Sequence, residues 1–194
     1  MEAAVQHPLL PGGLRYQVTV KEYEAMAGVF PPDARLELIE GEILTMSPTG
    51  WKHVRAIKNL TRLLSQLVDD EAQVSVQNPI VLSTHSEPLP DVALLRPSAD
   101  DHDGNAEVPD IWLLIEVSDG TLPYDLGTKL PLYARHGIQE VWVVDVDHEV
   151  VRQFLEPAGT RYEIDRVWAH GTEISTKVLP AITLAVDDIL RWRR

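Results

Sequence analysis

The sequence predicts an α/β fold in which a mixed β-sheet is flanked by helices, with extra β-strands at both ends of the chain. Two apolar, strand-like runs, Leu89 to Leu95 and Ile111 to Asp119, lie at its centre. A long segment with helical spacing precedes them, and a helix and another buried strand follow. That order is typical of a sheet with both parallel and antiparallel pairs, because a helix usually connects parallel strands.

Length and composition predict one globular domain. The chain has 194 residues, of which 44% are apolar and 24% charged, enough for a substantial core. Residues 10–13 read Leu-Pro-Gly-Gly, which breaks any helix or strand. We therefore expect a loose N-terminal arm over residues 1–18 and a single domain over residues 19–194.

Charge and cysteine content exclude several kinds of protein. The net charge of -13 and the pI near 4.8 argue against a protein whose whole surface attracts nucleic acid, but they do not exclude a local basic patch. The absence of cysteine excludes disulfides, thiolate zinc sites and cysteine nucleophiles. There is no secretory signal pattern and no apolar run of membrane-spanning length, so we expect a cytoplasmic protein without a membrane partner.

The first half of the chain predicts a helix, a hairpin and a second helix. Thr19, with Glu22 three residues later, predicts the start of a short helix. Residues 35–46 predict a hairpin with a tight turn at Glu40-Gly41, in which Glu37 lies on the face opposite its apolar neighbours. Apolar residues at helical spacing from His53 to Val68 predict one long amphipathic helix.

The second half predicts the rest of the sheet. The run 74–82 contains Asn78-Pro79, which favours an edge or bulged strand, and the polar stretch 97–110 favours a mobile surface loop. A helix over 126–136, closed by Gly137, would be the crossover to a buried parallel strand. The remaining predicted elements are that strand at 140–146, antiparallel strands at 150–155 and 162–168, and an extended segment with a helical turn over 179–190.

Two acids stand in apolar strands where a buried carboxylate requires a partner. Asp91 opens the first central run and Glu116 lies near the end of the second. Since the two runs would be neighbouring strands, both carboxylates could meet at one end of the sheet. Magnesium prefers a few carboxylate oxygens together with water and phosphate, so the pair would suit it. The alternative is that each acid ends a strand in water.

An ordered series of motifs carries a resemblance to a known family. The motifs are Leu36-Glu37-Leu38-Ile39-Glu40-Gly41-Glu42, Met46-Ser47-Pro48 followed by His53, Pro90-Asp91, Glu116-Val117-Ser118, Lys129 with Leu132-Tyr133-Ala134, Gly137 and Val141-Trp142-Val143-Val144-Asp145. Together they resemble the Uma family of restriction-endonuclease-like proteins, within the PD-(D/E)xK nuclease superfamily. The likeness extends over roughly residues 19–190 and implies a restriction-endonuclease-like core.

The resemblance implies metal-dependent hydrolysis of DNA phosphodiester bonds. Asp91 and Glu116 would bind Mg²⁺, with Mn²⁺ as the alternative ion, and the backbone carbonyl of Val117 would be a further ligand. Glu37 matches the family's first acid and would bind the metal or orient a water. Its alternative interpretation is a solvated hairpin acid.

The sequence departs from the superfamily signature at Ser118, which stands where a lysine is usual. Serine is uncharged and does not stabilise the negative charge of the transition state. Lys129 matches the lysine that the family carries on the following helix, and its long stem could reach back to the site. Pro131 indicates that the helix either begins near Leu130, with Lys129 at its amino terminus, or kinks there.

Two further residues could support the site. His53 could contact phosphate or orient Glu37, and Tyr133 lies one helical turn after Lys129, although both also suit a packing role. The other histidines lack metal-ligand spacing, so we do not expect zinc. The terminal Arg191-Trp192-Arg193-Arg194, with Arg161 and Arg166, predicts either a small basic patch or a solvated tail.

Two hypotheses of function follow from the sequence. The first is a Mg²⁺-dependent endodeoxyribonuclease that binds DNA and acts as a homodimer or higher homo-oligomer, since cutting both strands requires two sites. The second is a non-catalytic nuclease-fold protein that binds a nucleic acid or a protein partner. A carboxylate pair acting on a glycosidic bond is disfavoured, because no aromatic residue lines the proposed strand ends.

Overall fold

The computed structural model of the chain describes residues 15–31, 33–46, 49–101 and 103–192. Most of the predicted N-terminal arm, residues 1–14, therefore lies outside the described residues. The helices are α1 (Val20–Ala25), α2 (Trp51–Leu67), α3 (Leu122–Tyr124), α4 (Leu130–Arg135), α5 (Val186–Ile189), the 3-10 turns η1 (Ala27–Val29), η2 (Asp69–Glu71), η3 (Pro97–Asp101) and η4 (Val108–Asp110), and the π-helical turn η5 (Asp125–Lys129).

Within the described residues, the strands form one large sheet and three small ones. They are β1 (Leu36–Ile39), β2 (Glu42–Thr45), β3 (Gln73–Val76), β4 (Ile80–Val81), β5 (Val92–Leu95), β6 (Ala106–Glu107), β7 (Ile111–Ser118), β8 (Glu140–Asp145), β9 (Val150–Ala158), β10 (Arg161–Trp168), β11 (Glu173–Ser175) and β12 (Thr183–Ala185). The large sheet has the order β10-β9-β8-β7-β5-β3. Its β7–β8 pair is parallel and its other pairs are antiparallel, which confirms the predicted mixed α/β fold.

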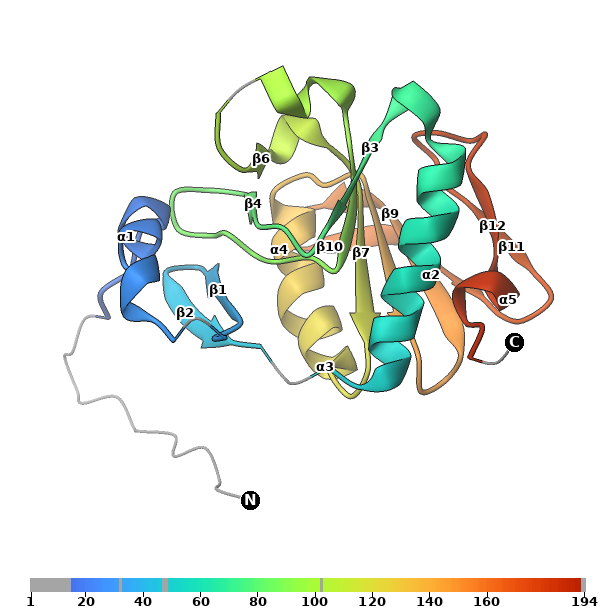
Figure 1. Cartoon of the computed structure of the whole chain (residues 1–194), viewed down its shortest axis with the longest axis horizontal. Helices are drawn as coiled ribbons and strands as arrows, with labels where there is room; N and C mark the ends of the chain where they lie inside the picture. Colours follow the sequence, from blue (N-terminus) through green and yellow to red (C-terminus); the bar gives the residue numbers. More distant parts are fainter. Residues whose placement is uncertain (1–14, 32, 47–48, 102, 193–194) are drawn as a thin grey trace.

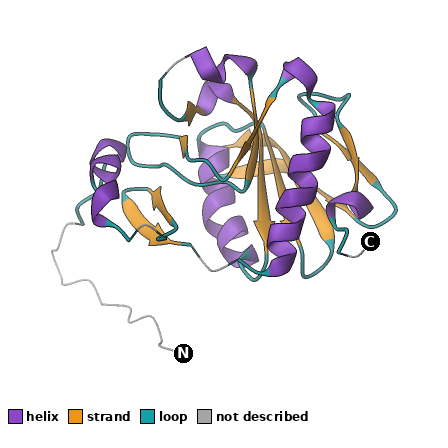
Figure 2. Ribbon diagram, in the orientation of Figure 1, coloured by secondary structure: helices purple, strands orange, loops and turns teal. Residues whose placement is uncertain are grey.

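The large sheet separates two hydrophobic clusters, as the helices on its two sides in Figure 2 suggest. Along β7, Leu113 and Ile115 belong to the cluster with α2 and the C-terminal elements, whereas Leu114 belongs to the cluster with α4. Because strand side chains alternate between faces, Glu116 lies on the α4 face, which carries Tyr133. The position of Glu116 therefore follows from the packing of its neighbours.

The N-terminal elements confirm the predicted helix and hairpin. The Thr19 side chain accepts from the Glu22 N–H while the Glu22 carboxylate accepts from the Thr19 N–H, which is a capping box. The hairpin turns at Glu40 and Gly41, whose φ angles of 50° and 81° fit the left-handed residues of a tight hairpin turn. Figure 1 shows α1 and this hairpin at one end of the molecule, with β11, β12 and α5 at the other.

Two predictions for the segment 74–110 need correction. The predicted single strand over 74–82 is two strands, β3 at the edge of the large sheet and β4 paired with β6, because Gln77 adopts a φ of 51° and Pro79 has no N–H for a ladder. The stretch 97–110 is not a plain loop either, since it contains η3, β6 and η4.

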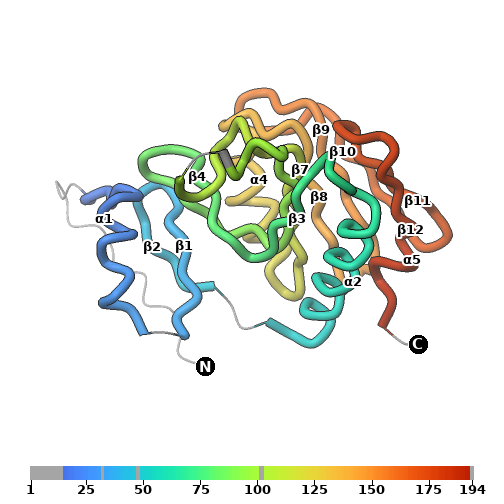
Figure 3. The backbone as a smooth tube through the Cα atoms, turned by 45° about the horizontal axis from the view of Figure 1, so that its top comes forward, coloured from blue at the N-terminus to red at the C-terminus, as the bar shows by residue number. Residues whose placement is uncertain are grey.

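The crossover from β7 to β8 begins earlier than predicted. Helical backbone starts at Leu122 and continues through the π-helical η5 into α4, so the interpretation that places a helix start at Leu130 is wrong. Gly137 closes the helix with a φ of 74°, as predicted. The structure adds β11, which the sequence analysis missed, and Figure 3 shows it beside β12 and α5.

Candidate active site

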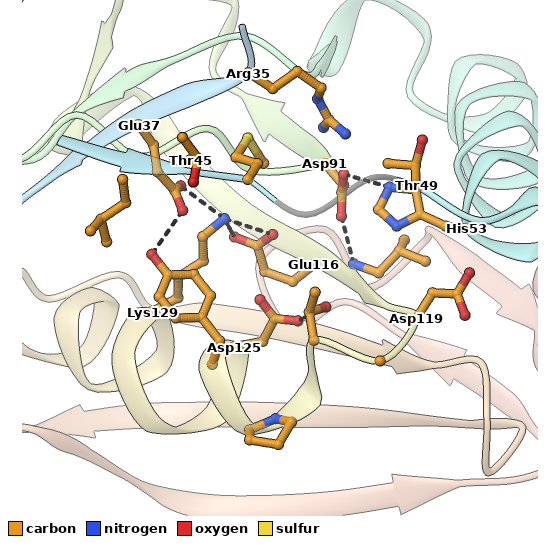
Figure 4. A pocket seen from close by; sticks show the side chains of 17 residues that line it. Arg35, Glu37, Thr45, Thr49, His53, Asp91, Glu116, Asp119, Asp125 and Lys129 are labelled. Carbon is orange, nitrogen blue, oxygen red and sulfur yellow. Dashed lines mark hydrogen bonds and ion pairs between the residues drawn. The ribbon is translucent and has the colours of Figure 1, made fainter. Parts of the chain in front are cut away.

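A cavity of about 450 Å³ lies at the end of the large sheet where β7 leads into the crossover helices. Its lining comes from the hairpin β1–β2, the start of α2, Asp91, the end of β7 and the segment from Asp119 to Lys129. Figure 4 shows the side chains of Glu37, Asp91, Glu116 and Lys129 gathered there. The structure thus brings together the four residues to which the sequence analysis assigned a catalytic role.

Asp91 and Glu116 come from adjacent antiparallel strands. Val92 pairs with Ile115, so the preceding Asp91 lies beside Glu116 at the same edge of the sheet. Asp91 Oδ2 accepts from the Val117 N–H at 2.9 Å, and Oδ1 lies 3.0 Å from His53 Nε2. Burial raises the pKa of Asp91, but the hydrogen bond and charge of His53 and the Val117 N–H outweigh it, so that the pKa lies below its usual value.

Glu116 is buried and bound by the side chains of the crossover helices. Lys129 Nζ lies 3.2 Å from Glu116 Oε1 and 3.3 Å from Oε2, and the Tyr133 hydroxyl donates to Oε1. Burial raises the pKa of Glu116 to about 8, with neighbouring Asp91 adding to the rise and Lys129 opposing it. Glu116 therefore needs positive charge beyond that of Lys129 to be ionised at neutral pH.

Glu37 reaches the same lysine from the hairpin. Its Oε2 lies 3.2 Å from Lys129 Nζ, and its Oε1 accepts a 2.8 Å hydrogen bond from the Tyr124 hydroxyl. The isolated bridge between Leu38 and Glu87 holds β1 against the chain that leads to Asp91. Glu37 is only 2% exposed, so its interpretation as a solvated hairpin acid is wrong.

The π-helical turn η5 sets the direction of Lys129. Asp125 and Lys129, at its two ends, are both buried, and both line the cavity. Ser118 Oγ donates to Asp125 Oδ2 at 2.6 Å, and Thr121 Oγ1 donates to the same oxygen at 2.8 Å. Ser118, which stands in place of the signature lysine, therefore joins the end of β7 to the turn that carries Lys129.

The site contains more buried acid than buried base. Four buried carboxylates, those of Glu37, Asp91, Glu116 and Asp125, surround the single ammonium of Lys129. Burial lowers the pKa of Lys129, but the carboxylates of Glu116 and Glu37 raise it by more than burial lowers it, so the lysine stays charged. The excess of negative charge favours binding of a further cation.

The donors present fit a magnesium-type site. Within the described residues, no group of three or more His, Cys, Asp and Glu is arranged to hold a metal. A metal would therefore rest on Asp91 and Glu116, a backbone oxygen such as that of Val117, and water. Magnesium commonly binds through one or two carboxylates and keeps several waters, so this donor set suits it.

Several residues of the cavity were not predicted from the sequence, among them Arg35, Tyr124 and Asp125. Arg35 precedes Glu37 by two positions, and the two-residue period of a strand could have placed both on one face. Asp125, Lys129 and Tyr133 follow one another at intervals of four, which could have placed them on one helix face. For Tyr124 the sequence carried no such signal.

Arg35 differs from the other charged groups of the cavity. Its Nη2 atom is buried and, among the described residues, has no hydrogen-bond partner. Figure 4 shows its guanidinium pointing into the cavity from the hairpin side. A buried, unpaired guanidinium nitrogen is costly, which is expected at a position that binds an anionic ligand.

His53 and Gly50 connect the start of α2 to the site. His53 is buried and contacts Asp91, not Glu37 as one prediction had it. A Cβ added at Gly50 would lie 2.0 Å from Asp119 Oδ2, so a larger residue there would displace the Asp119 side chain, and the contact of His53 with Asp91 fixes the start of α2 at the site. The first turn of α2 is thereby held against the cavity.

Comparisons with known proteins agree with this geometry. The profile of the Uma2 family, described as "Putative restriction endonuclease", matches residues 20–187. A crystal structure described as "a putative nuclease belonging to DUF820", from Anabaena variabilis ATCC 29413, is similar with a TM-score of 0.70 and 17% sequence identity. The match covers 90% of this chain and 98% of that one. A search of curated proteins gave no match.

Proposed function

The chain belongs to the Uma2 family, and from that premise we propose that it is an endonuclease that hydrolyses DNA phosphodiester bonds with Mg²⁺ or Mn²⁺. The observation that carries the proposal is the excess of buried carboxylates around one buried lysine in an open cavity. A purely structural cluster would be expected to balance its charges. The family and the nuclease-like fold support a nuclease, while the metal and the DNA substrate are parts of the proposal.

Asp91 and Glu116, with the Val117 carbonyl, would hold the metal ion, which supplies an activated water and neutralises phosphate charge. His53 and Tyr133 keep the two carboxylates oriented through the hydrogen bonds described above. The overall reaction adds water across one P–O bond and leaves a hydroxyl end and a phosphomonoester end.

Lys129 and Arg35 would act on the phosphate itself. Lys129 stays charged among the carboxylates, so its ammonium can stabilise the negative charge that develops on the phosphate oxygens. Glu37 holds that ammonium from the hairpin side and is available to orient a water. The free Nη2 of Arg35 would bind a phosphate oxygen and position the substrate.

Cleavage of both strands of a duplex would require two such sites. We therefore propose that the active form is a homodimer, which places two copies of the cavity on one DNA. Sedimentation of the protein with and without duplex DNA would test this part separately.

A cleavage assay tests the main proposal. Wild type, Asp91→Ala and Lys129→Ala would be incubated with plasmid and branched DNA in Mg²⁺ or Mn²⁺, with EDTA as the metal-free control. We expect metal-dependent cleavage by wild type only. Equal residual cleavage in all three would indicate contamination, and no cleavage at all would favour the alternative of a non-catalytic binding module.

A further inference from the structure

Helix α2 has a charge unlike that of the rest of the protein. The whole chain carries 30 acids against 17 lysines and arginines. Within α2, however, the sequence WKHVRAIKNLTRLLSQL contains four basic residues and no acid. A concentration of positive charge on one element of an acidic protein is unexpected unless that element meets a negatively charged partner.

The four basic residues form one stripe on the outer side of the helix. Lys52, Arg55, Lys58 and Arg62 follow one another at intervals of three and four, which places them on one face. Lys58 and Arg62 are exposed, and the other two are half-buried. The opposite face packs into the core through Ala56, Ile57, Leu60 and Leu64.

The charges of the stripe are not neutralised within the described part of the chain. None of the four basic side chains forms an ion pair there, whereas several basic side chains elsewhere on the surface do. Those that pair with a carboxylate include Arg15, Arg135, Arg152, Arg161, Lys177 and Arg191. Lys52 lies close enough to Glu149 to lower the pKa of that carboxyl, so the exposed and unpaired charges of the stripe are those of Lys58 and Arg62.

The stripe begins at the edge of the candidate active site. His53, next to Lys52, contacts Asp91 in the cavity, and the following turns carry the basic side chains away from it. From Lys52 to Arg62 the helix rises about 15 Å, and duplex DNA carries one phosphate per strand every ~3.4 Å along its axis. Figure 1 shows α2 running along the outside of the sheet from its start near α3.

We propose that the exposed face of α2 binds the phosphate backbone of duplex DNA next to the bond in the cavity. This inference rests on the proposed function. Trp51 and Trp192 lie beside the first half of the stripe, where they line a pocket with Arg55 and Lys58, but the cations continue along the helix to Arg62. A row of cations that extends beyond the aromatic side chains suits the regular phosphates of a duplex backbone better than single strands, which stack on aromatic rings. The only cation–π contact of the stripe within the described residues is at its start, where Lys52 lies over the Trp192 ring.

A matched pair of charge variants tests the inference. Lys58→Gln/Arg62→Gln removes one lysine and one arginine from the stripe, both exposed and outside the cavity lining. Lys21→Gln/Arg166→Gln removes the same charge from exposed residues on α1 and β10 that form no ion pair with a described residue. Both variants thus have the same net charge and differ only in location.

Binding of a fluorescein-labelled duplex of about three helical turns would be followed by anisotropy, with Ca²⁺ in place of Mg²⁺ to limit cleavage. The slope of the logarithm of the association constant against the logarithm of the salt concentration should become about 1.8 less steep in the α2 variant, which corresponds to ~0.9 for each lost phosphate contact. The slope of the control variant should equal that of wild type. Equal slopes in wild type and α2 variant, or equal loss in both variants, would overturn the inference. Stronger competition by single-stranded than by duplex DNA would overturn it as well.

Cleavage measured on the same variants separates this inference from the proposed function. If the wild-type protein binds duplex DNA through α2 but does not cleave it, the proposed function is wrong and the inference about α2 stands. If the α2 variant cleaves DNA with the same KM and salt dependence as wild type, the inference about α2 is wrong and the proposed function stands.

Discussion

Two fully buried glutamates on neighbouring strands, Glu116 on β7 and Glu140 on β8, are held in opposite ways. Glu140 begins its strand at the far end of the sheet, where Oε1 accepts from Trp142 Nε1 and Gln153 Nε2 and Oε2 accepts from the Lys177 N–H, each at 2.7 Å. Glu116 lies near the end of its strand, beside a cavity that it shares with a charged lysine and three other buried acids.

The difference shows that burial alone does not mark a functional acid. Neutral donors from β8, β9 and the segment after β11 satisfy Glu140, so it joins the C-terminal elements to the sheet. Glu116 lines the cavity, has other acids as neighbours and has a raised pKa. Its surroundings are suited to binding a cation, whereas those of Glu140 are suited to a fixed structure.

The largest expected effect concerns activity. Glu116→Gln should slow DNA cleavage by roughly 10²–10³-fold or more, because a neutral amide neither holds the metal nor keeps the charge balance of the site. Glu140→Gln should leave the cleavage rate of the folded protein within about threefold of the wild-type rate, because Glu140 does not line the cavity. Single-turnover cleavage of a plasmid would measure both.

The same two variants should show the reverse order in stability. Glu140→Gln turns one acceptor into a donor among three donors, which should cost about 1.5–3 kcal/mol in urea unfolding. At pH 7 without metal, Glu116→Gln should change stability little, because a carboxyl with a pKa of about 8 is already mostly neutral. Equal destabilisation by both variants would contradict the structural role assigned to Glu140 alone.

Lys129 should matter more to the fold than a surface lysine. Lys129→Met leaves the buried acids of the cavity without their cation and should destabilise the protein by roughly 3 kcal/mol, whereas Lys177→Met, which breaks an exposed pair with Glu156, should cost less than about 1 kcal/mol. Mn²⁺ should recover part of the loss only for Lys129→Met, since a bound cation replaces the missing charge. Thermal melts with and without Mn²⁺ would measure this.

Arg35 provides a smaller test on the same cavity. Arg35→Met should lower kcat/KM for DNA by about tenfold through KM, because it removes a donor to phosphate, and it should not lower stability, since Nη2 has no partner to lose among the described residues. A control at Arg166→Met on β10 should leave KM unchanged. An unchanged KM for Arg35→Met would argue against its contact with phosphate.

The smallest expected effect lies away from both glutamates. His170 lies between Glu149 and Asp187, and hydrogen bonds to Asp187 and Glu149 raise its pKa. Because the pKa of His170 is higher in the folded than in the unfolded protein, its interactions with Asp187 and Glu149 stabilise the fold fully below pH ~6.5. This stabilisation is lost as the pH rises through the folded pKa. Melting temperatures of wild type and His170→Asn should therefore differ more at pH 6 than at pH 9.

Much of the fold could be predicted because local patterns and tertiary packing agree. The capping box at Thr19, the turn at Gly41 and the helical spacing of α2 each have a single physical solution. The split between β3 and β4 could not be predicted, because it depends on the pairing of β4 with a distant strand. The same holds for β11, whose partner is β12.

The sequence motifs predicted the main residues of the site but not the packing that positions them. Asp91 and Glu116 were expected to meet because neighbouring strands place them together. The burial of Glu37 depends on packing of the hairpin against the rest of the chain, which a single strand pattern does not show. The π-helical turn that directs Asp125 and Lys129 inward has no sequence signal of its own.

The most direct test of the account is calorimetric titration of Mn²⁺ into wild type, Glu116→Gln and Glu140→Gln. We expect heat of binding from wild type and from Glu140→Gln, with its loss or severe weakening in Glu116→Gln, because Glu116 lines the cavity beside Asp91 and Glu140 does not line it. Binding that persists unchanged in Glu116→Gln, or no binding by wild type, would contradict the central claim that this cavity is a metal site.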